Sequence, residues 1–170
     1  MFEPPLIRYT IGDTYLGRLL VAATPKGVCT VSFADKDRVL IEHLQLAFPD
    51  TSPTRDDRGL AAFLAELCLY LAGATSDPDL PLDLRGTPFQ LRVWNAMRKI
   101  PRSQTRSYRE VARMIGKPLA ARAVARACAL NPAMLVIPCH RVIGTDGSIR
   151  GRQECIVRRR RLLEAEQRSE

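Results

Sequence analysis

Residues 107–130 read SYREVARMIGKPLAARAVARACAL, and this stretch holds the clearest pattern of secondary structure in the second half of the chain. Ser107 and Glu110 make the S-x-x-E pattern of a capping box, which predicts a helix that runs through Met114. The Gly-Lys-Pro sequence at 116–118 interrupts that helix, and a second helical segment follows. Two helices joined by a short glycine-containing turn are typical of a helix-turn-helix, although many other helix corners share the pattern.

The second of these helices carries many small side chains. Arg122 and Arg126 are four residues apart and therefore share one face of it. A helix of small residues can approach another surface closely, which suits the minor groove of DNA, where shape and phosphates dominate over sequence. Packing against a neighbouring helix explains the same residues equally well. The alanines are Ala120, Ala121, Ala123, Ala125, Ala127 and Ala129.

Charge is divided unevenly between the two halves of the chain. Residues 1–85 carry 8 basic and 12 acidic side chains, whereas residues 86–170 carry 18 and 6, so the net charges are −4 and +12. A difference of this size suggests that the second half binds a polyanion, most often nucleic acid. On charge alone, a solvated basic surface is an equally good explanation.

The length and composition are those of a globular protein. The 170 residues suffice for one large domain or two small ones, and 46% of them are apolar. No apolar stretch is long enough to span a membrane, and the first residues do not resemble an export signal, so we expect a cytoplasmic protein that binds no membrane. The five cysteines are scattered, which argues against a disulfide framework, and no C-x-x-C or H-x-x-H pair suggests a metal site.

The first half of the chain predicts a small sheet with helices. Residues 8–35 alternate apolar and polar side chains between glycine and proline breaks, which predicts two or three antiparallel strands. Helical spacing of apolar residues predicts a short helix over 35–48, with His43 at its surface or boundary. The same spacing predicts a longer helix over 56–72, with Cys68 in the core.

The second half predicts a mainly helical domain. After an extended linker rich in Asp and Pro, Thr87 and Pro88 supply an N-cap and a first-turn proline for a helix that buries Trp94. We therefore predict an α/β protein, with a small antiparallel sheet-and-helix domain over residues 1–79. A mainly helical domain with the helix-turn-helix is predicted over residues 80–170.

A cysteine and a histidine stand side by side in VIPCHRVIG, residues 136–144. Pro138 favours an extended backbone before it, so residues 134–138 are expected to form a buried strand-like segment that ends at Cys139. A free cysteine has a pKa of about 8.5, so little of it is thiolate at neutral pH, and His140 or the following arginine could raise that fraction. Sequence neighbours usually point to different sides, so an interaction between this pair needs a tight turn or a bridging water. By itself, this short motif favours a structural role.

Several motifs in the second half resemble those of the O6-alkylguanine-DNA alkyltransferases. The sequence Pro-Cys-His-Arg-Val over 138–142 follows an Asn-Pro pair at 131–132. The segments LRGTPFQLRVWNAMRKIP, SYREVARMIGKP and ARAV precede it in the order that the family has. The resemblance covers about residues 80–150, and it is strongest to the carboxy-terminal half of bacterial adaptive-response proteins. The first half resembles the family only in its pattern of elements.

This resemblance implies a DNA repair protein, a methylated-DNA–protein-cysteine methyltransferase, that acts once and needs no cofactor or metal. Cys139 would take the alkyl group from guanine O6 irreversibly. His140 would deprotonate Cys139 through a water, and Glu166 in the last helix would orient His140. Asn131 would support the turn that presents the cysteine.

The partner implied by the resemblance is double-stranded DNA that contains O6-alkylguanine, bound by a monomer, with cooperative binding left open. A base cannot be reached inside the duplex, so the damaged nucleotide would swing out into a pocket while Arg122 enters the base stack. Tyr108 would contact a phosphate or donate a hydrogen bond to the leaving guanine. Further contacts to DNA or the base are expected from Arg109, Ala123, Asn131 and Thr145.

One segment departs from the family pattern. Arg152, Gln153, Glu154 and Cys155 stand where the family usually has a loop with an aromatic residue and glycines that walls the base pocket. We expect slower transfer as a result, and we expect Glu154 to pair with a nearby arginine. The departure keeps open the alternative of an alkyltransferase-like protein that binds lesions without transfer. A cysteine hydrolase is a further alternative, against which the basic helix-turn-helix counts.

Overall fold

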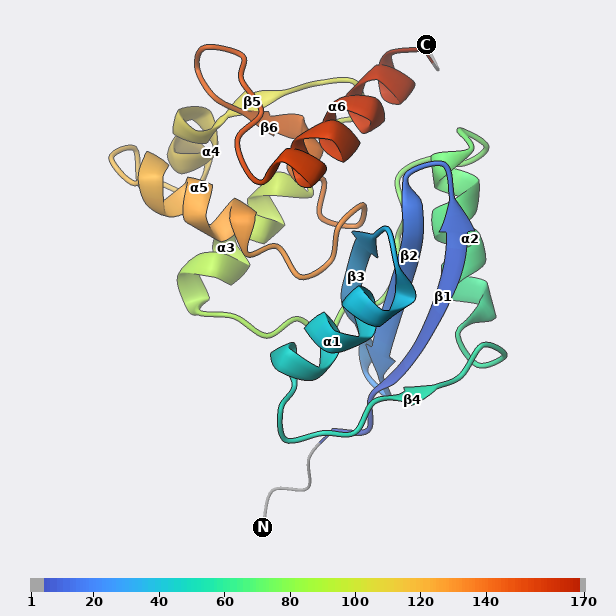
Figure 1. Cartoon of the computed structure of the whole chain (residues 1–170). Helices are drawn as coiled ribbons and strands as arrows, with labels where there is room; N and C mark the ends of the chain where they lie inside the picture. Colours follow the sequence, from blue (N-terminus) through green and yellow to red (C-terminus); the bar gives the residue numbers. More distant parts are fainter. Residues whose placement is uncertain (1–4, 169–170) are drawn as a thin grey trace. The chain divides into compact units, whose positions relative to one another are not determined.

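The computed structural model describes residues 5–168 and has two compact units, one that ends at Leu84 and one that begins at Arg85 (Figure 1). The first unit contains β1 (Arg8–Thr14), β2 (Gly17–Thr24), β3 (Gly27–Ala34), α1 (Asp37–Ala47), β4 (Thr54–Arg55) and α2 (Ala61–Leu71). The second contains α3 (Pro88–Met97), β5 (Arg106–Ser107), α4 (Tyr108–Met114), α5 (Ala121–Ala129), the 3₁₀ turn η1 (Cys139–Arg141), β6 (Val142–Ile143) and α6 (Gln153–Arg168). These elements confirm the predicted α/β class. No helix within residues 5–168 is long and apolar enough to cross a membrane.

The sheet of the first unit has the strand order β3-β2-β1-β4. β1, β2 and β3 are antiparallel, as the alternation over residues 8–35 predicts. β4 pairs in parallel with β1, so the sheet is mixed rather than purely antiparallel. Periodicity could not reveal β4, because it has only two residues.

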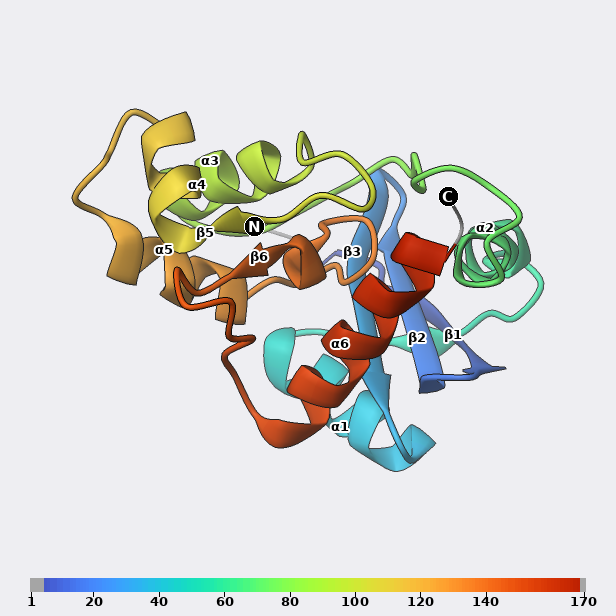
Figure 2. The same ribbon diagram turned by 90° about the horizontal axis from the view of Figure 1, so that it is seen from above.

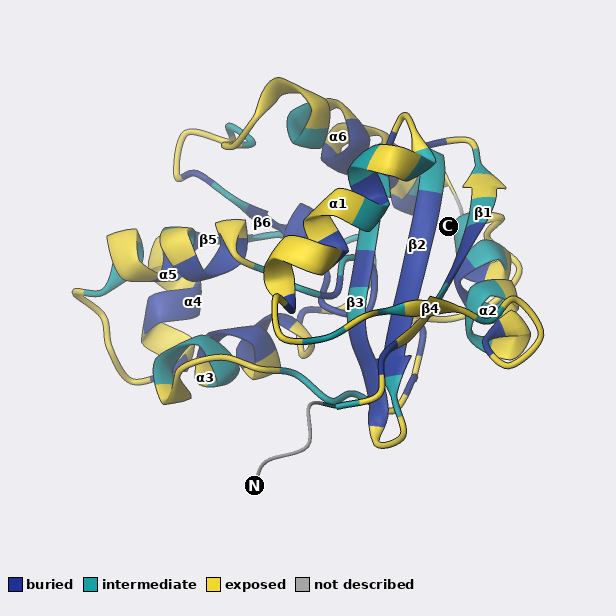
Figure 3. Cartoon of the chain, turned by 60° about the horizontal axis from the view of Figure 1, so that its bottom comes forward, coloured by how far each residue is buried: buried dark blue, intermediate teal, exposed yellow. Residues whose placement is uncertain are grey.

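Helices α1 and α2 cover opposite faces of this sheet (Figure 2). Ile11 of β1 belongs to the core cluster that includes Leu40 and Leu44 of α1. The next residue, Gly12, points to the other face, where an added Cβ would come within 2.9 Å of Leu64 on α2. Both faces are therefore covered, and β2 is buried along most of its length (Figure 3).

The helix α2 is shorter than its apolar spacing predicts. It begins at Ala61 rather than at Asp56, because the Asp56 carboxylate accepts the Gly59 N–H at 2.8 Å and the residues before Ala61 form turns. Cys68 is only half-buried and does not belong to the core. It lies at the edge of the face that buries Leu67 and Tyr70.

The extended segment before the second unit is bonded to the sheet of the first. The Val28 N–H donates to the Pro81 carbonyl at 2.7 Å, and the Asp83 N–H donates to the Val28 carbonyl at 2.9 Å. The Thr24 hydroxyl adds a bond of 2.6 Å to the Asp83 carboxylate. Because of these bonds, residues 80–84 belong to the first unit of the structure. The sequence pattern instead places the start of the second domain at residue 80.

The helix starts predicted for the second unit are confirmed. Thr87 caps α3 and Ser107 caps α4, each in a capping box with the side chain three residues further on. Trp94 of α3 is buried, and its Nε1–H donates to the Ala127 carbonyl of α5 at 2.9 Å. The single tryptophan is therefore a core residue that ties α3 to α5, as predicted.

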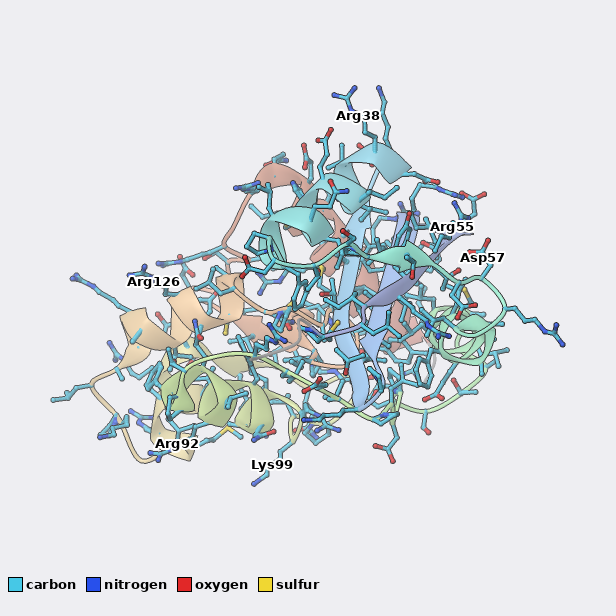
Figure 4. The ribbon with its side chains drawn as sticks, turned by 90° about the horizontal axis from the view of Figure 1, so that it is seen from below. Arg38, Arg55, Asp57, Arg92, Lys99 and Arg126 are labelled. Carbon is cyan, nitrogen blue, oxygen red and sulfur yellow. The ribbon has the colours of Figure 1, made fainter. Side chains whose placement is uncertain are left out.

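Helices α4 and α5 form the predicted helix-turn-helix, with Gly116 in the left-handed region (φ 71°) at the turn. Packing within the unit explains Ala127, which is buried, whereas Ala123 is exposed, and close approach of α5 to DNA stays a prediction. The exposed side chains of α5 include both Arg122 and Arg126. Figure 4 shows Arg126 on α5, Arg92 on α3 and Lys99 just after the end of α3, with side chains that extend from the ribbon.

The segment before Cys139 is buried, but it is not the predicted strand. The Ile137 N–H donates to the Ala133 carbonyl at 2.9 Å, and Leu135 adopts a left-handed φ of 73°. Residues 134–138 consequently form turns that deliver the chain to the 3₁₀ turn η1. Their apolar character predicted burial correctly, but a short apolar run cannot distinguish a strand from a buried turn.

The expected loop at 152–155 is also different in the structure. Helix α6 begins at Gln153, so most of this segment is the first turn of a helix. Gln and Glu favour helix where glycine would oppose it, which explains the early start. Glu154 is exposed there, and the nearby Arg159 donates to backbone carbonyls rather than to the Glu154 carboxylate.

Candidate functional site

The 3₁₀ turn η1 contains both members of the Cys-His pair. The Cys139 N–H donates to the Ile137 carbonyl at 2.8 Å, and the Arg141 N–H donates to the Pro138 carbonyl at 3.0 Å. Cys139, His140 and Arg141 are all buried. The chain therefore makes a tight turn at the motif, one of the two ways in which this pair could interact, and the turn holds both side chains inside the second unit.

Asn131 closes the segment that leads into this turn. Its Nδ2 donates to the Ile137 carbonyl at 2.9 Å, and its Oδ1 accepts the Ala133 N–H at 3.0 Å. The same side chain forms a hydrogen bond with Cys139 that favours the thiolate. Asn131 thus touches both the backbone before the cysteine and the cysteine itself.

Glu166 lies at the centre of a buried ionic cluster. Its carboxylate faces His140 Nε2 at 2.7 Å and accepts Arg141 Nη2 at 2.7 Å and the Ser103 N–H at 3.1 Å. Arg141 also donates to the Ile100 carbonyl at 2.8 Å. A carboxylate can only accept, so Nε2 of His140 carries the hydrogen and Nδ1 carries the lone pair.

Burial sets the protonation states of the Cys-His pair. Burial raises the pKa of the Cys139 thiol, and the Arg159 guanidinium and the Asn131 hydrogen bond oppose this. Burial also lowers the pKa of His140, and the bond to Glu166 opposes this. At neutral pH the turn therefore holds a thiol and a neutral imidazole that can serve as a base.

Arg159 joins the acceptor turn to α6. Its Nη2 donates to the carbonyls of Cys139 and Val142, both at 2.6 Å, and its Nη1 donates to the Arg150 carbonyl at 2.7 Å. Only 6% of Arg159 is exposed. The backbone on the carboxyl side of the cysteine is therefore fixed by a buried guanidinium.

The remaining cysteines show no sign of a metal centre. Cys128 is buried on α5, its thiol contacts Met97 at 3.5 Å, and burial raises its pKa to about 12. Cys29 is buried in the first unit, and Cys155 is half-buried at the start of α6. Across residues 5–168, no cluster of His, Cys, Asp or Glu could hold a metal ion.

The residues expected to contact DNA lie on three elements of the second unit. Tyr108 and Arg109 open α4, where Tyr108 is buried and Arg109 is exposed. Arg122 and Ala123 are exposed on α5, and Thr145 is exposed after β6. The pairing of β5 with β6 places the start of α4 beside the strand that follows η1. The structure thus brings the α4 terminus to the acceptor turn and leaves the α5 arginine on an outer surface.

The sequence patterns did not identify every residue that surrounds the acceptor turn. Those patterns point to neither Ser103 nor Arg159, and they mark Arg141 only as a nearby charge. One signal was available on α6, where Arg159, Leu162 and Glu166 share the buried face at helical spacing. Charged residues that share a helix face with a buried leucine are expected to point into the protein and to form buried ion pairs or hydrogen bonds. Ser103 could not be found in this way, because its backbone N–H makes the contact.

Two family models together match nearly the whole chain. The ribonuclease-like domain of 6-O-methylguanine DNA methyltransferase matches residues 7–84. The DNA binding domain of 6-O-methylguanine DNA methyltransferase matches residues 88–168. The two matches meet where the structure passes from its first unit to its second.

Curated relatives extend over both units. The bifunctional transcriptional activator/DNA repair enzyme Ada of Escherichia coli K12 is 42% identical over 164 residues, which cover 96% of this chain and 46% of Ada. The chain also spans 46% of the regulatory protein ada of Salmonella typhimurium, so it has about half the length of these two relatives. The methylated-DNA–protein-cysteine methyltransferase of Mycolicibacterium paratuberculosis is 41% identical over 164 residues, which cover 96% of this chain and 94% of the relative.

Solved structures of similar proteins agree with these matches. The O6-methylguanine methyltransferase of Mycobacterium tuberculosis has a TM-score of 0.84 at 35% identity, with 97% of this chain and 95% of that chain covered. The Mycobacterium tuberculosis OGT structure in complex with DNA has a TM-score of 0.81 at 37% identity, with 95% and 94% covered. The resemblance found in the sequence motifs is confirmed, and the chain belongs to the family of 6-O-methylguanine DNA methyltransferases, the methylated-DNA–protein-cysteine methyltransferases.

Proposed function

We propose that this protein repairs O6-alkylguanine in double-stranded DNA by moving the alkyl group to Cys139 in a single turnover, without a cofactor. The observation that carries the proposal is the buried turn in which Cys139 is followed by His140 bonded to Glu166. A thiol is a weak nucleophile at neutral pH, and this arrangement supplies an oriented neutral base. The names of the methyltransferase relatives support the same reaction.

The proposed transfer balances in atoms and protons. The Cys139 proton passes through a water to Nδ1 of His140, because Nε2 already faces Glu166. The thiolate sulfur attacks the alkyl carbon, a C–S bond forms, and the C–O bond breaks with its electron pair moving to guanine O6. Tyr108 is our candidate to donate a proton to the guanine, and the proton that His140 received from the thiol then restores the Tyr108 hydroxyl. The thioether that remains on Cys139 is stable, so each molecule acts once.

We assign DNA binding to the second unit, which carries the +12 half of the chain. The exposed small and arginine side chains of α5 support close approach to the minor groove, where Arg122 would fill the gap left by the flipped base. Arg109, Ala123 and Thr145 are exposed and are proposed to contact the backbone or the base. A monomeric state and a cytoplasmic location remain predictions.

The test is to incubate the protein with a duplex that contains O6-methylguanine and to weigh the protein intact. We expect each molecule to gain the mass of one methylene group, and peptide mapping to place it on Cys139. The Cys139→Ser variant should bind the duplex and gain nothing. A methyl group on Cys155 or Cys29 would contradict the assignment of the acceptor. Binding by the unmodified protein without a gain in mass would identify a lesion-binding protein instead.

A further inference from the structure

The Arg159 guanidinium connects three separate parts of the second unit. It donates to the carbonyl of the acceptor Cys139, to that of Val142 at the start of β6, and to that of Arg150 in the segment before α6. Because Arg159 belongs to α6, one side chain ties the last helix to both ends of the segment that follows the acceptor.

The hydrogen bonds of Arg159 differ in kind from those of Arg141 in the buried ionic cluster. Arg141 is bonded to the Glu166 carboxylate, whereas the bonds of Arg159 go to neutral carbonyl oxygens. Burying a charge is costly unless hydrogen bonds compensate it, and here the three carbonyls accept from Nη1 and Nη2, whereas Nε is buried without a hydrogen-bond partner among the described residues. The positive charge of Arg159 is consequently not cancelled by the carboxylate that neutralises Arg141.

We propose that Arg159 is a positioning residue for the alkyl transfer, one that fixes the Cys139 turn and holds a positive charge near the sulfur as the thiolate forms. This inference rests on the proposed function. The Cys139 N–H is bonded to Ile137 and its carbonyl to Arg159, so the backbone of the acceptor is held on both sides. A guanidinium suits this role because its planar fork can donate to several carbonyls at once, whereas a lysine ammonium is a single point of charge.

The groups around the acceptor show why the charge of Arg159 matters. Burial and the neighbouring thiol of Cys155 raise the pKa of Cys139, whereas Arg159 and the Asn131 hydrogen bond lower it. Of these groups, Arg159 supplies the positive charge. Several groups on different elements influence the titration of the Cys139 thiol or of its neighbours. They are Arg159 and Cys155 on α6, Cys128 on α5, Asn131 in the preceding segment, and His140, Arg141 and Glu166 in the buried ionic cluster.

The test uses iodoacetamide as a probe that needs no DNA. Its reaction with Cys139 is followed by peptide mass mapping over a range of pH in the unmodified protein and in Arg159→Gln, Arg159→Lys and Arg160→Gln. Arg160→Gln is the matched control, because it removes the same charge from an exposed position next along α6. Methyl transfer from an O6-methylguanine duplex is measured on the same four proteins, and urea unfolding reports their stability.

We expect Arg159→Gln to shift the midpoint of Cys139 alkylation to higher pH and to lower its rate at neutral pH, because the substitution removes a positive charge that lowers the pKa of the thiol. Arg159→Lys should keep the midpoint, because the charge remains, but it should slow methyl transfer, because one ammonium cannot reach all three carbonyls. The control should change neither property.

Equal alkylation profiles for Arg159→Gln and Arg160→Gln would overturn the proposal, even if Arg159→Gln were less stable. If Arg159→Gln does not fold, Arg159→Lys still decides, and an unchanged methyl-transfer rate in that variant would overturn the positioning role. Failure of the proposed function itself would look different, because the unmodified protein would then gain no methyl group from DNA.

Discussion

Replacing Glu166 with glutamine should destabilise the second unit by about 3 kcal/mol, because loss of one partner from a buried ion pair typically costs about 3–5 kcal/mol. Glutamine keeps the size of the side chain and an oxygen that can still accept from Ser103 or His140. It removes the charge that faces Arg141, of which only 1% is exposed. We place the cost at the lower end of the range because these neutral contacts can partly survive.

The unfolding of this unit can be followed with a fluorescent probe of its own. Trp94 is the only tryptophan and is buried in the second unit, so its fluorescence during urea unfolding reports on that unit. With a urea dependence of about 2 kcal/mol per M, a loss of about 3 kcal/mol lowers the midpoint by about 1.5 M. Glu164→Gln is the control on the same helix, since Glu164 is 51% exposed and its contact with Arg168 at 3.7 Å is a surface pair worth about 0–1 kcal/mol. A midpoint for Glu166→Gln that coincides with that of Glu164→Gln would refute the argument that burial makes this charge essential.

Two further predictions concern the thiol on α5 and the arginine that faces outward. Burial raises the pKa of Cys128 from 9.0 to about 12, so the stability it contributes is present below pH 9.0 and is lost as pH rises towards 12. Urea unfolding should therefore show a smaller alkaline loss of stability in Cys128→Ala than in the unmodified protein, and equal losses would contradict the assignment. Arg122→Ala should slow repair of duplex DNA much more than reaction with free O6-alkylguanine base, because only the duplex requires flipping. Similar losses on both substrates would show that Arg122 serves the fold or the pocket instead.

The sequence predicted best where the interacting residues are close along the chain. The capping boxes at Thr87 and Ser107 join residues three positions apart, so their patterns alone specified the starts of α3 and α4. The apolar spacing predicted a helix boundary wrongly where a side-chain hydrogen bond to a nearby backbone group stabilised a turn instead. Asp56 bonds to the Gly59 N–H and delays α2, although the apolar spacing continues through it. At Gln153 the family pattern suggested a loop, but the helix-forming residues of this chain extend α6.

The class of fold, the helix-turn-helix, the basic character of the second half and the family of the Cys139 motif could all be predicted from the sequence. The way in which that cysteine is held became visible in the folded protein. Its carbonyl is bonded to Arg159, 20 residues away, and the adjacent histidine is bonded to Glu166, 26 residues away. No sequence pattern predicts which residues such contacts join, because the contacts depend on how α6 packs against the acceptor turn. The protonation states of Cys139 and His140 follow from the same packing, since burial is the largest cause of both pKa shifts.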